Sequence, residues 1–207
     1  MPAYFSMVTT VRKEDDYEEF FARYIECLID NGYAFKSGYY EAANKSLEEL
    51  IEINVTKLRE NFELGYDASI YNDYKQIVFE YPNLSEVRIF IINDGQGDYY
   101  TISLIIPEDD IIDWNGGEPD YDDAFMNELK KLAIDIWRYR NVDNIQTELE
   151  LSDGAALPGE MEAGASASIE PFAIVEKERY HSADSDKYIS LEIERGGILI
   201  ENASISL

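Results

Sequence analysis

Residues 76–106, QIVFEYPNLSEVRIFIINDGQGDYYTISLII, are the stretch that decides the expected fold. Three runs within it, at 76–81, 86–93 and 98–106, are rich in the β-branched and aromatic residues that favour strands. Pro82 pre-sets a turn between the first two runs, and Gly95 and Gly97 lie between the second and the third. The stretch therefore predicts an antiparallel three-stranded meander at the centre of the fold.

Three amphipathic helices are predicted around this meander, over residues 14–31, 46–63 and 122–140. Each range repeats apolar residues at the three- and four-residue spacing that places them on one helical face. Ser46 and Glu49 match a capping box, which marks the start of the second helix. The fold class predicted is α+β, with a mostly antiparallel sheet covered by three helices.

The remainder of the chain contains further strands around a segment of different composition. Residues 144–151 alternate like a strand and complete a core domain over 1–151. Residues 152–170 are rich in Gly, Ala and Ser, which is typical of a mobile loop or linker. The C-terminal part, 171–207, returns to strand patterns at 172–178, 188–194 and 198–205. These strands are expected either on the same sheet or in a small second sheet.

The length and composition are those of one folded domain with a real core, because 45% of the 207 residues are hydrophobic. Cys27 is the only cysteine, so the chain forms no intrachain disulfide and no thiolate zinc cluster. No stretch has the length and apolar character of a signal peptide or a membrane span. We therefore expect a cytoplasmic protein.

The net charge is extreme. The sequence carries 43 acidic and 17 basic residues, a formal charge of −26, and it has no basic residue between Arg88 and Lys130. Nucleic acids and anionic membranes are excluded as direct ligands, since their binding depends on Lys and Arg. A positively charged protein partner is expected instead.

No catalytic or cofactor-binding signature is present. His181 is the only histidine and has no nucleophile motif beside it. Gly95 and Gly97 lack the third glycine of a dinucleotide-binding loop and the Gly-Lys-Ser/Thr of a phosphate loop. The acidic loop at residues 109–123 lacks the spacing of a calcium-binding loop, so a solvated acidic rim is favoured there over a metal site. The aspartates of that loop are Asp109, Asp110, Asp113, Asp120, Asp122 and Asp123.

A partner-binding surface is predicted where aromatic residues alternate with acidic ones. Aromatic rings among carboxylates suit Arg and Lys side chains, because stacking and ion pairing can coincide. The simpler alternative, in which the aromatic residues are partly core and the acids only keep the protein soluble, stays open. The predicted surface consists of Asp98, Tyr99, Tyr100, Glu108, Asp109, Asp110, Asp113, Trp114, Glu118, Asp120, Tyr121, Asp122 and Asp123.

The first functional hypothesis is a non-catalytic inhibitor that occupies the Lys/Arg surface of a basic nucleic-acid-handling protein, such as a nuclease. Anti-CRISPR and anti-restriction proteins of the DNA-mimic type are the analogy, which rests on composition alone. The alternative is an immunity protein that neutralises a cognate toxin. A carboxylate-metal enzyme and an acidic adaptor domain are the remaining hypotheses, and no oligomeric state is predicted.

Overall fold

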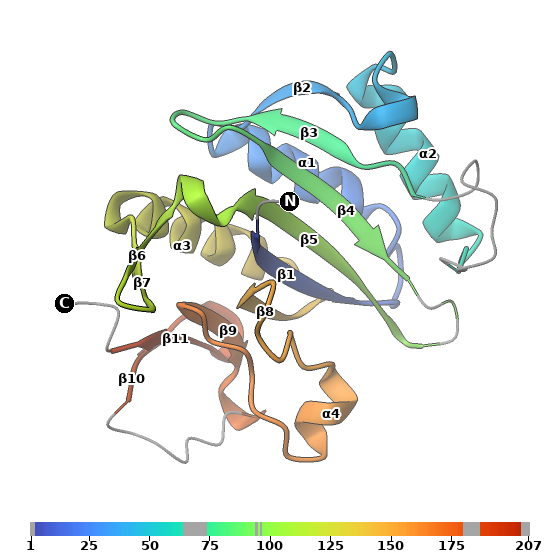
Figure 1. Ribbon diagram of the computed structural model, residues 1–207. Helices are drawn as coiled ribbons and strands as arrows, with labels where there is room; N and C mark the ends of the chain where they lie inside the picture. The colour runs from blue at the N-terminus through green and yellow to red at the C-terminus, as the bar shows by residue number, and fades with distance from the viewer. Residues whose placement is uncertain (1–2, 64–73, 94, 96, 180–186, 204–207) are drawn as a thin grey trace.

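The computed structural model describes residues 3–63, 74–93, 95, 97–179 and 187–203. In these residues the chain forms a nine-stranded antiparallel sheet, a separate two-stranded sheet and four α-helices (Figure 1). The predicted α+β class with a large antiparallel sheet is confirmed. The prediction underestimated the number of elements, because the sheet extends well beyond a three-stranded meander and a fourth helix is present.

The strand order of the large sheet is β10-β11-β9-β8-β1-β5-β4-β3-β2. The predicted meander is its β3-β4-β5 part. The strands are β1 (Tyr4–Arg12), β2 (Ala34–Gly38), β3 (Ile77–Glu80), β4 (Val87–Ile92), β5 (Tyr99–Pro107), β8 (Val142–Leu149), β9 (Phe172–Glu176), β10 (Tyr188–Glu192) and β11 (Gly197–Asn202).

Strand β1 lies at the centre of the sheet, although no strand was predicted there. It pairs with β5 on one side and with β8 on the other. Phe5, Met7 and Val11 are buried under the helices, and Ser6 and Thr10 alternate with them on the opposite face. This mixture of hydroxyl and apolar side chains explains why the segment does not stand out as an apolar run.

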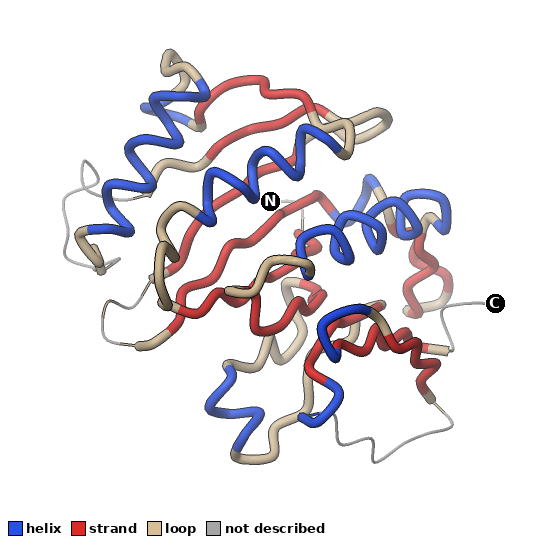
Figure 2. Tube along the Cα trace, turned by 180° about the vertical axis from the view of Figure 1, so that it is seen from behind, coloured by secondary structure: helices blue, strands red, loops and turns tan. Residues whose placement is uncertain are grey.

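Three helices cover one face of the sheet (Figure 2): α1 (Phe20–Asp30), α2 (Leu47–Arg59) and α3 (Asp123–Trp137). The predicted capping box is confirmed, because the Ser46 hydroxyl accepts from the Glu49 N–H and the Glu49 carboxylate accepts from the Ser46 N–H. Helix α1 begins later than expected. Residues before it form turns, and Asp16 adopts a φ of 58°, which is incompatible with a continuous helix. None of the described helices combines the length and the apolar character needed to cross a lipid bilayer.

The segment expected to be a loop or linker packs on the other face of the sheet. It contains the short helix α4 (Pro158–Glu162), and Met161 and Ile169 are buried against β9 and β11. The fully buried amide of Gln146 on β8 donates to the Ala156 carbonyl at 2.7 Å and accepts from the Ser168 N–H at 2.8 Å. One side chain thus fixes both ends of the segment to the sheet.

The C-terminal strands β9, β10 and β11 belong to the large sheet and are fastened to α3. The indole of Trp137 is fully buried and donates to the Glu194 carbonyl at 2.9 Å. Arg195 stacks on that indole with its guanidinium carbon 4.6 Å from the ring centre, and it donates to the Trp137 and Tyr139 carbonyls. The 3-10 turn between β10 and β11 (Glu194–Gly196) therefore caps the C-terminal end of α3.

A buried carboxylate joins β1, β8 and the end of β9. The Asp143 side chain is 1% exposed and accepts from Arg12 Nε at 2.7 Å. Arg179 Nη1, from the 3-10 turn Lys177–Arg179, donates to both Asp143 oxygens at 2.9 and 3.0 Å. Glu176 contacts both arginines, at 3.3 and 3.1 Å. Two of the few cations of the chain are thus used inside the fold.

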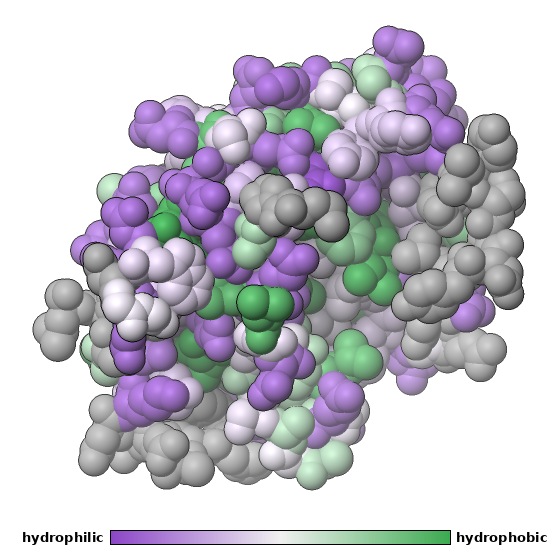
Figure 3. Space-filling view, viewed as in Figure 1, coloured by the Kyte–Doolittle hydropathy of each residue, from purple (hydrophilic) through white to green (hydrophobic). Residues whose placement is uncertain are grey.

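No described helix covers the outer face of β1, β5, β4 and β3. Figure 3 shows this face, where hydrophobic side chains gather in a hollow among hydrophilic ones. Ile92 of β4 is 45% exposed there. At the start of β4, the guanidinium of Arg88 lies 4.8 Å from the ring centres of both Tyr4 and Tyr39.

Candidate partner-binding surface

The acidic segment expected to be an irregular connection contains a β-hairpin. Strands β6 (Ile112–Asn115) and β7 (Glu118–Tyr121) form the two-stranded sheet. Gly116 and Gly117 make the turn with φ values of 68° and 95°, a region that glycine enters without steric cost. Residues 109–123 are called the acidic hairpin below.

The register of the acidic hairpin separates its aromatic and acidic side chains. Ile112 faces Tyr121 and both are buried, while Trp114, on the same face but nearer the tip, lies opposite Pro119 and is 48% exposed. The other face carries Asp113 directly opposite Asp120. The predicted mixture of rings and carboxylates is therefore two faces of one projecting element.

Aspartates line a hollow of about 340 Å³ at the base of the acidic hairpin. Two of them also hold the fold together: Asp110 accepts from the N–H and the hydroxyl of Ser85 at 2.8 and 2.7 Å, and Asp122 caps α3 by accepting from the Phe125 N–H at 3.0 Å. In the part of the chain that the structure describes, no three His, Cys, Asp or Glu side chains are placed to hold a metal ion. The lining aspartates are Asp109, Asp110, Asp113, Asp120 and Asp122.

Three residues of the predicted surface lie in the interior instead. Tyr100 is 2% exposed and donates to the Tyr17 carbonyl at 2.9 Å, and Tyr121 and Glu108 are 5% and 6% exposed. Burial raises the pKa of both tyrosine hydroxyls. These three side chains are part of the core and not of a contact surface.

Two other residues of the predicted surface lie far from the acidic hairpin. Asp98 and Tyr99 are at the start of β5, whereas the hairpin follows its end, about 27 Å away for a nine-residue strand. Tyr99 lies directly opposite Arg12 in the register of β1 and β5, beside the buried arginine network, and burial and then the charge of Asp143 raise the pKa of its hydroxyl. The exposed residues brought together by the fold are Asp109, Asp113, Trp114, Glu118, Asp120, Asp122 and Asp123.

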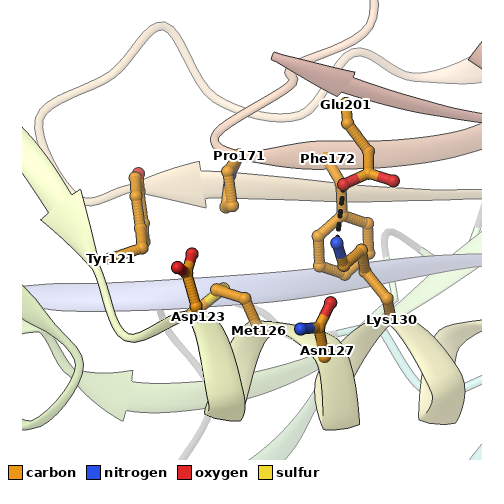
Figure 4. A pocket seen from close by; sticks show the side chains of 8 residues that line it. All are labelled: Tyr121, Asp123, Met126, Asn127, Lys130, Pro171, Phe172 and Glu201. Carbon is orange, nitrogen blue, oxygen red and sulfur yellow. Dashed lines mark hydrogen bonds and ion pairs between the residues drawn. The ribbon is translucent and has the colours of Figure 1, made fainter. Parts of the chain in front are cut away.

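A second pocket of about 220 Å³ lies between α3 and the C-terminal strands (Figure 4). Asp123, Met126 and Asn127 form one wall, with Pro171 and Phe172 opposite. At its end, Lys130 Nζ lies 2.6 Å from a Glu201 oxygen, and both side chains are mostly buried. This ion pair fastens β11 to α3, so the pocket is a joint between elements.

Three glutamates near the base of the acidic hairpin and the end of β8 make stability depend on pH. Burial raises the pKa of Glu108, Glu148 and Glu170 above the ordinary value of 4.5. The folded chain therefore binds protons more tightly than the unfolded chain in the interval above 4.5. The contribution of these groups to the free energy of unfolding should increase as pH falls through their raised pKa values, and it should be lost as pH rises through them.

Thermal unfolding at pH 5.5 and pH 8 tests this dependence. We expect a higher midpoint at pH 5.5, by about 2 to 4 °C for each kcal/mol gained. Glu148→Gln should reduce the difference more than Glu52→Gln on exposed α2, which relieves only general repulsion. A midpoint that falls on acidification over this range, or equal effects of both variants, would contradict the role of the buried carboxyls.

The acidic hairpin and its register were not predicted from the sequence. Its signal was present: the Gly116-Gly117 pair separates two short alternations, Ile112 and Trp114 before it and Pro119 and Tyr121 after it. Asp113, Asp120 and Pro119, whose residue types disfavour strands, masked the pattern. Comparisons of the chain with protein-family models, curated proteins and solved structures found no match.

Proposed function

We propose that this chain is a non-catalytic inhibitor of a basic, nucleic-acid-handling protein such as a nuclease, and that it occupies the Lys/Arg surface where nucleic acid binds. The acidic hairpin is the contact element. It presents carboxylates for ion pairs on one face and Trp114 for stacking on the other. A partner that closes around the hairpin meets both.

The observation that carries this proposal is the cross-strand pair of Asp113 and Asp120. Like charges directly opposite in a hairpin destabilise it by about 0.2 to 1 kcal/mol. Among the described residues, no Lys or Arg forms an ion pair with Asp113, Asp109 or Glu118. A cationic partner supplies the counter-charge that Asp109, Asp113 and Glu118 do not have among the described residues.

The hairpin variant Asp113→Asn/Asp120→Asn should therefore change stability and binding in opposite directions. We expect its free energy of unfolding to rise by about 0.2 to 1 kcal/mol, because the repulsion is removed. Binding to the partner should weaken roughly tenfold or more, which corresponds to about 1.4 kcal/mol. Trp114→Ala should weaken binding roughly thirtyfold if the indole is an anchor.

Affinity capture from bacterial lysate identifies the partner. It is done at low and at about 0.5 M salt, because salt weakens a contact between charges, and with and without competing duplex DNA. Purified partner and chain then give the binding constants and the inhibition of nuclease activity. The matched control is Glu26→Gln/Glu52→Gln, which removes the same charge from exposed positions on α1 and α2. Equal weakening by the control would mean that diffuse charge, and not the acidic hairpin, makes the contact.

The compactness of this surface favours a second candidate, an immunity protein with one dedicated toxin. The exposed acids of the predicted surface gather on one projecting hairpin instead of following a row along the molecule, and Asp98 and Tyr99 lie elsewhere. Competition distinguishes the two functions. Duplex DNA displaces the partner of a DNA mimic, whereas a toxin held away from its nucleic-acid channel stays bound.

A further inference from the structure

The two edges of the large sheet differ in how they are protected. Edge strand β2 has a register irregularity between Phe35 and Ser37, and Lys36 on it pairs with Glu80 at 3.4 Å. Bulges and lysines are the usual devices that stop an edge from pairing with another chain. Edge strand β10 has neither, since it pairs with β11 in unbroken register and contains no Lys or Pro.

Strand β10 also exposes large aliphatic side chains. Ile189 and Leu191 are 55% and 59% exposed. They lie on the helix side of the sheet, because their cross-strand neighbours Glu201 and Leu199 contact α3 and the main core. Figure 1 shows β10 at the end of the sheet, and the strand order places no described strand on its outer side.

The hydrogen-bond pattern fixes which backbone groups of β10 point outward. The Lys187 carbonyl accepts from the Ala203 N–H at 2.8 Å, and the Ile193 N–H donates to the Gly197 carbonyl at 3.0 Å. Backbone groups of every second residue from 187 to 193 therefore bond to β11. Alternate residues of an antiparallel strand bond to opposite sides. The backbone groups of Tyr188, Ser190 and Glu192 therefore point away from the sheet.

These features make β10 complementary to itself, and we propose that two copies of the chain pair edge to edge through β10. A twofold axis at Ser190 aligns all three outward residues: Ser190 with its twin, and Tyr188 with the twin's Glu192. Each aligned pair exchanges two backbone hydrogen bonds. In this register Ile189 faces the twin's Leu191 at the closer, non-hydrogen-bonded spacing, so four aliphatic side chains form one cluster between the two α3 helices.

Charge favours a second copy at this edge in particular. Two chains of −26 repel, so a self-contact needs a place where the acids are balanced. Glu192, the one charged residue of β10, forms an ion pair with Lys177, and Lys187 lies 5.5 Å from the Tyr188 ring centre. In the part of the chain that the structure describes, Asp109, Asp113 and Glu118 of the acidic hairpin form no such ion pair, so the two proposed interfaces use different parts of the surface.

Sedimentation equilibrium tests the pairing. Wild-type chain should show twice the monomer mass at high concentration, and raising salt from about 0.05 to 0.5 M should strengthen the dimer by screening its net repulsion. Salt should have the opposite effect on the contact proposed with a basic partner, which it weakens. The response to salt therefore distinguishes the two contacts, and failure of one proposal leaves the other standing. A wild-type monomer up to about 0.5 mM at 0.5 M salt overturns the pairing.

Variants identify the edge. Leu191→Lys should weaken the dimer roughly tenfold or more, because it puts charge into the aliphatic cluster, and Ser190→Pro should do the same by removing outward N–H groups. Both side chains are exposed in one copy, so the fold is retained. Ile29→Lys on α1, an aliphatic residue 44% exposed, is the matched control and should leave the dimer unchanged.

Disulfide formation tests the register. Ser190→Cys should cross-link to its twin under mild oxidation, since paired residues of adjacent strands lie within disulfide reach. Glu52→Cys on exposed α2 should not. A dimer that resists Leu191→Lys and Ser190→Pro, or that forms no Ser190→Cys cross-link, overturns the proposal.

Discussion

Gly197→Ala is expected to destabilise the protein by about 3 kcal/mol, a large loss for one methyl group. A Cβ at this position would lie 2.6 Å from Cε2 and 2.9 Å from Cζ2 of Trp137, well inside van der Waals contact. The indole cannot move away, because it is fully buried, bonded to the Glu194 carbonyl and covered by Arg195. The β10–β11 hairpin must therefore separate from α3.

Thermal unfolding followed by tryptophan fluorescence in a Trp114→Phe background reports Trp137 alone, since the chain has two tryptophans. The midpoint should fall by roughly 6 to 12 °C. Gly159→Ala in α4 is the matched control, because no atom lies within 4 Å of a Cβ built there and its midpoint should change little. Equal midpoints for the two variants would mean that Gly197 does not pack on the indole.

Asp143→Asn is expected to cost about 3 kcal/mol or more, although it changes the shape of the side chain very little. Removing one member of a buried ion network leaves its partners without compensation. Arg12 and Arg179 both donate to this carboxylate, and their side chains are only 26% and 23% exposed. An amide cannot balance two guanidinium groups. Of the remaining carboxylates near them, Glu176 contacts both arginines at 3.3 and 3.1 Å, while the more exposed Glu14 and Glu162 lie 3.9 and 3.7 Å from Arg12 and Arg179.

Urea unfolding of Asp143→Asn beside Glu128→Gln measures this cost. Glu128 pairs with Lys131 at 4.0 Å in solvent and should contribute less than about 0.5 kcal/mol. The triple variant Arg12→Met/Asp143→Leu/Arg179→Met should recover much of the loss, because apolar residues of similar volume remove the buried charges together. Comparable costs for Asp143→Asn and Glu128→Gln would rule out a structural role for the network.

The elements predicted from the sequence are those with strong local signals. The meander, the capped helix α2 and helix α3 each combine a regular apolar period with clear end signals, and all three are present. Strand β1 was missed because Ser6 and Thr10 alternate with Phe5 and Met7, so no apolar run marks it, and only its place between β5 and β8 makes it central. Such a place depends on contacts far apart in the chain, which local patterns do not encode.

The candidate site was predicted in composition but not in shape. The acids and Trp114 were identified from their sequence positions, yet hairpin register decides which of them share a face. Glu108 and Tyr121 belong to the same acidic stretch, but both are buried by packing against the rest of the fold. Asp94, which lies in the expected turn between the second and third strands of the meander, and the lone His181 are outside the described residues.

The central position of β1 bears on when the protein can fold during its synthesis. This strand is made well before its two neighbours in the sheet, β5 and β8. At typical rates of about 5 to 20 residues per second, roughly 7 to 27 s separate the synthesis of β1 from that of β8. The edge of β1 that pairs with β8 must remain unpaired through that interval, so the nascent chain exposes backbone groups that can pair with other chains. Because a large net charge makes chains repel one another, we expect the surplus of acidic residues to oppose the association of growing copies during this interval.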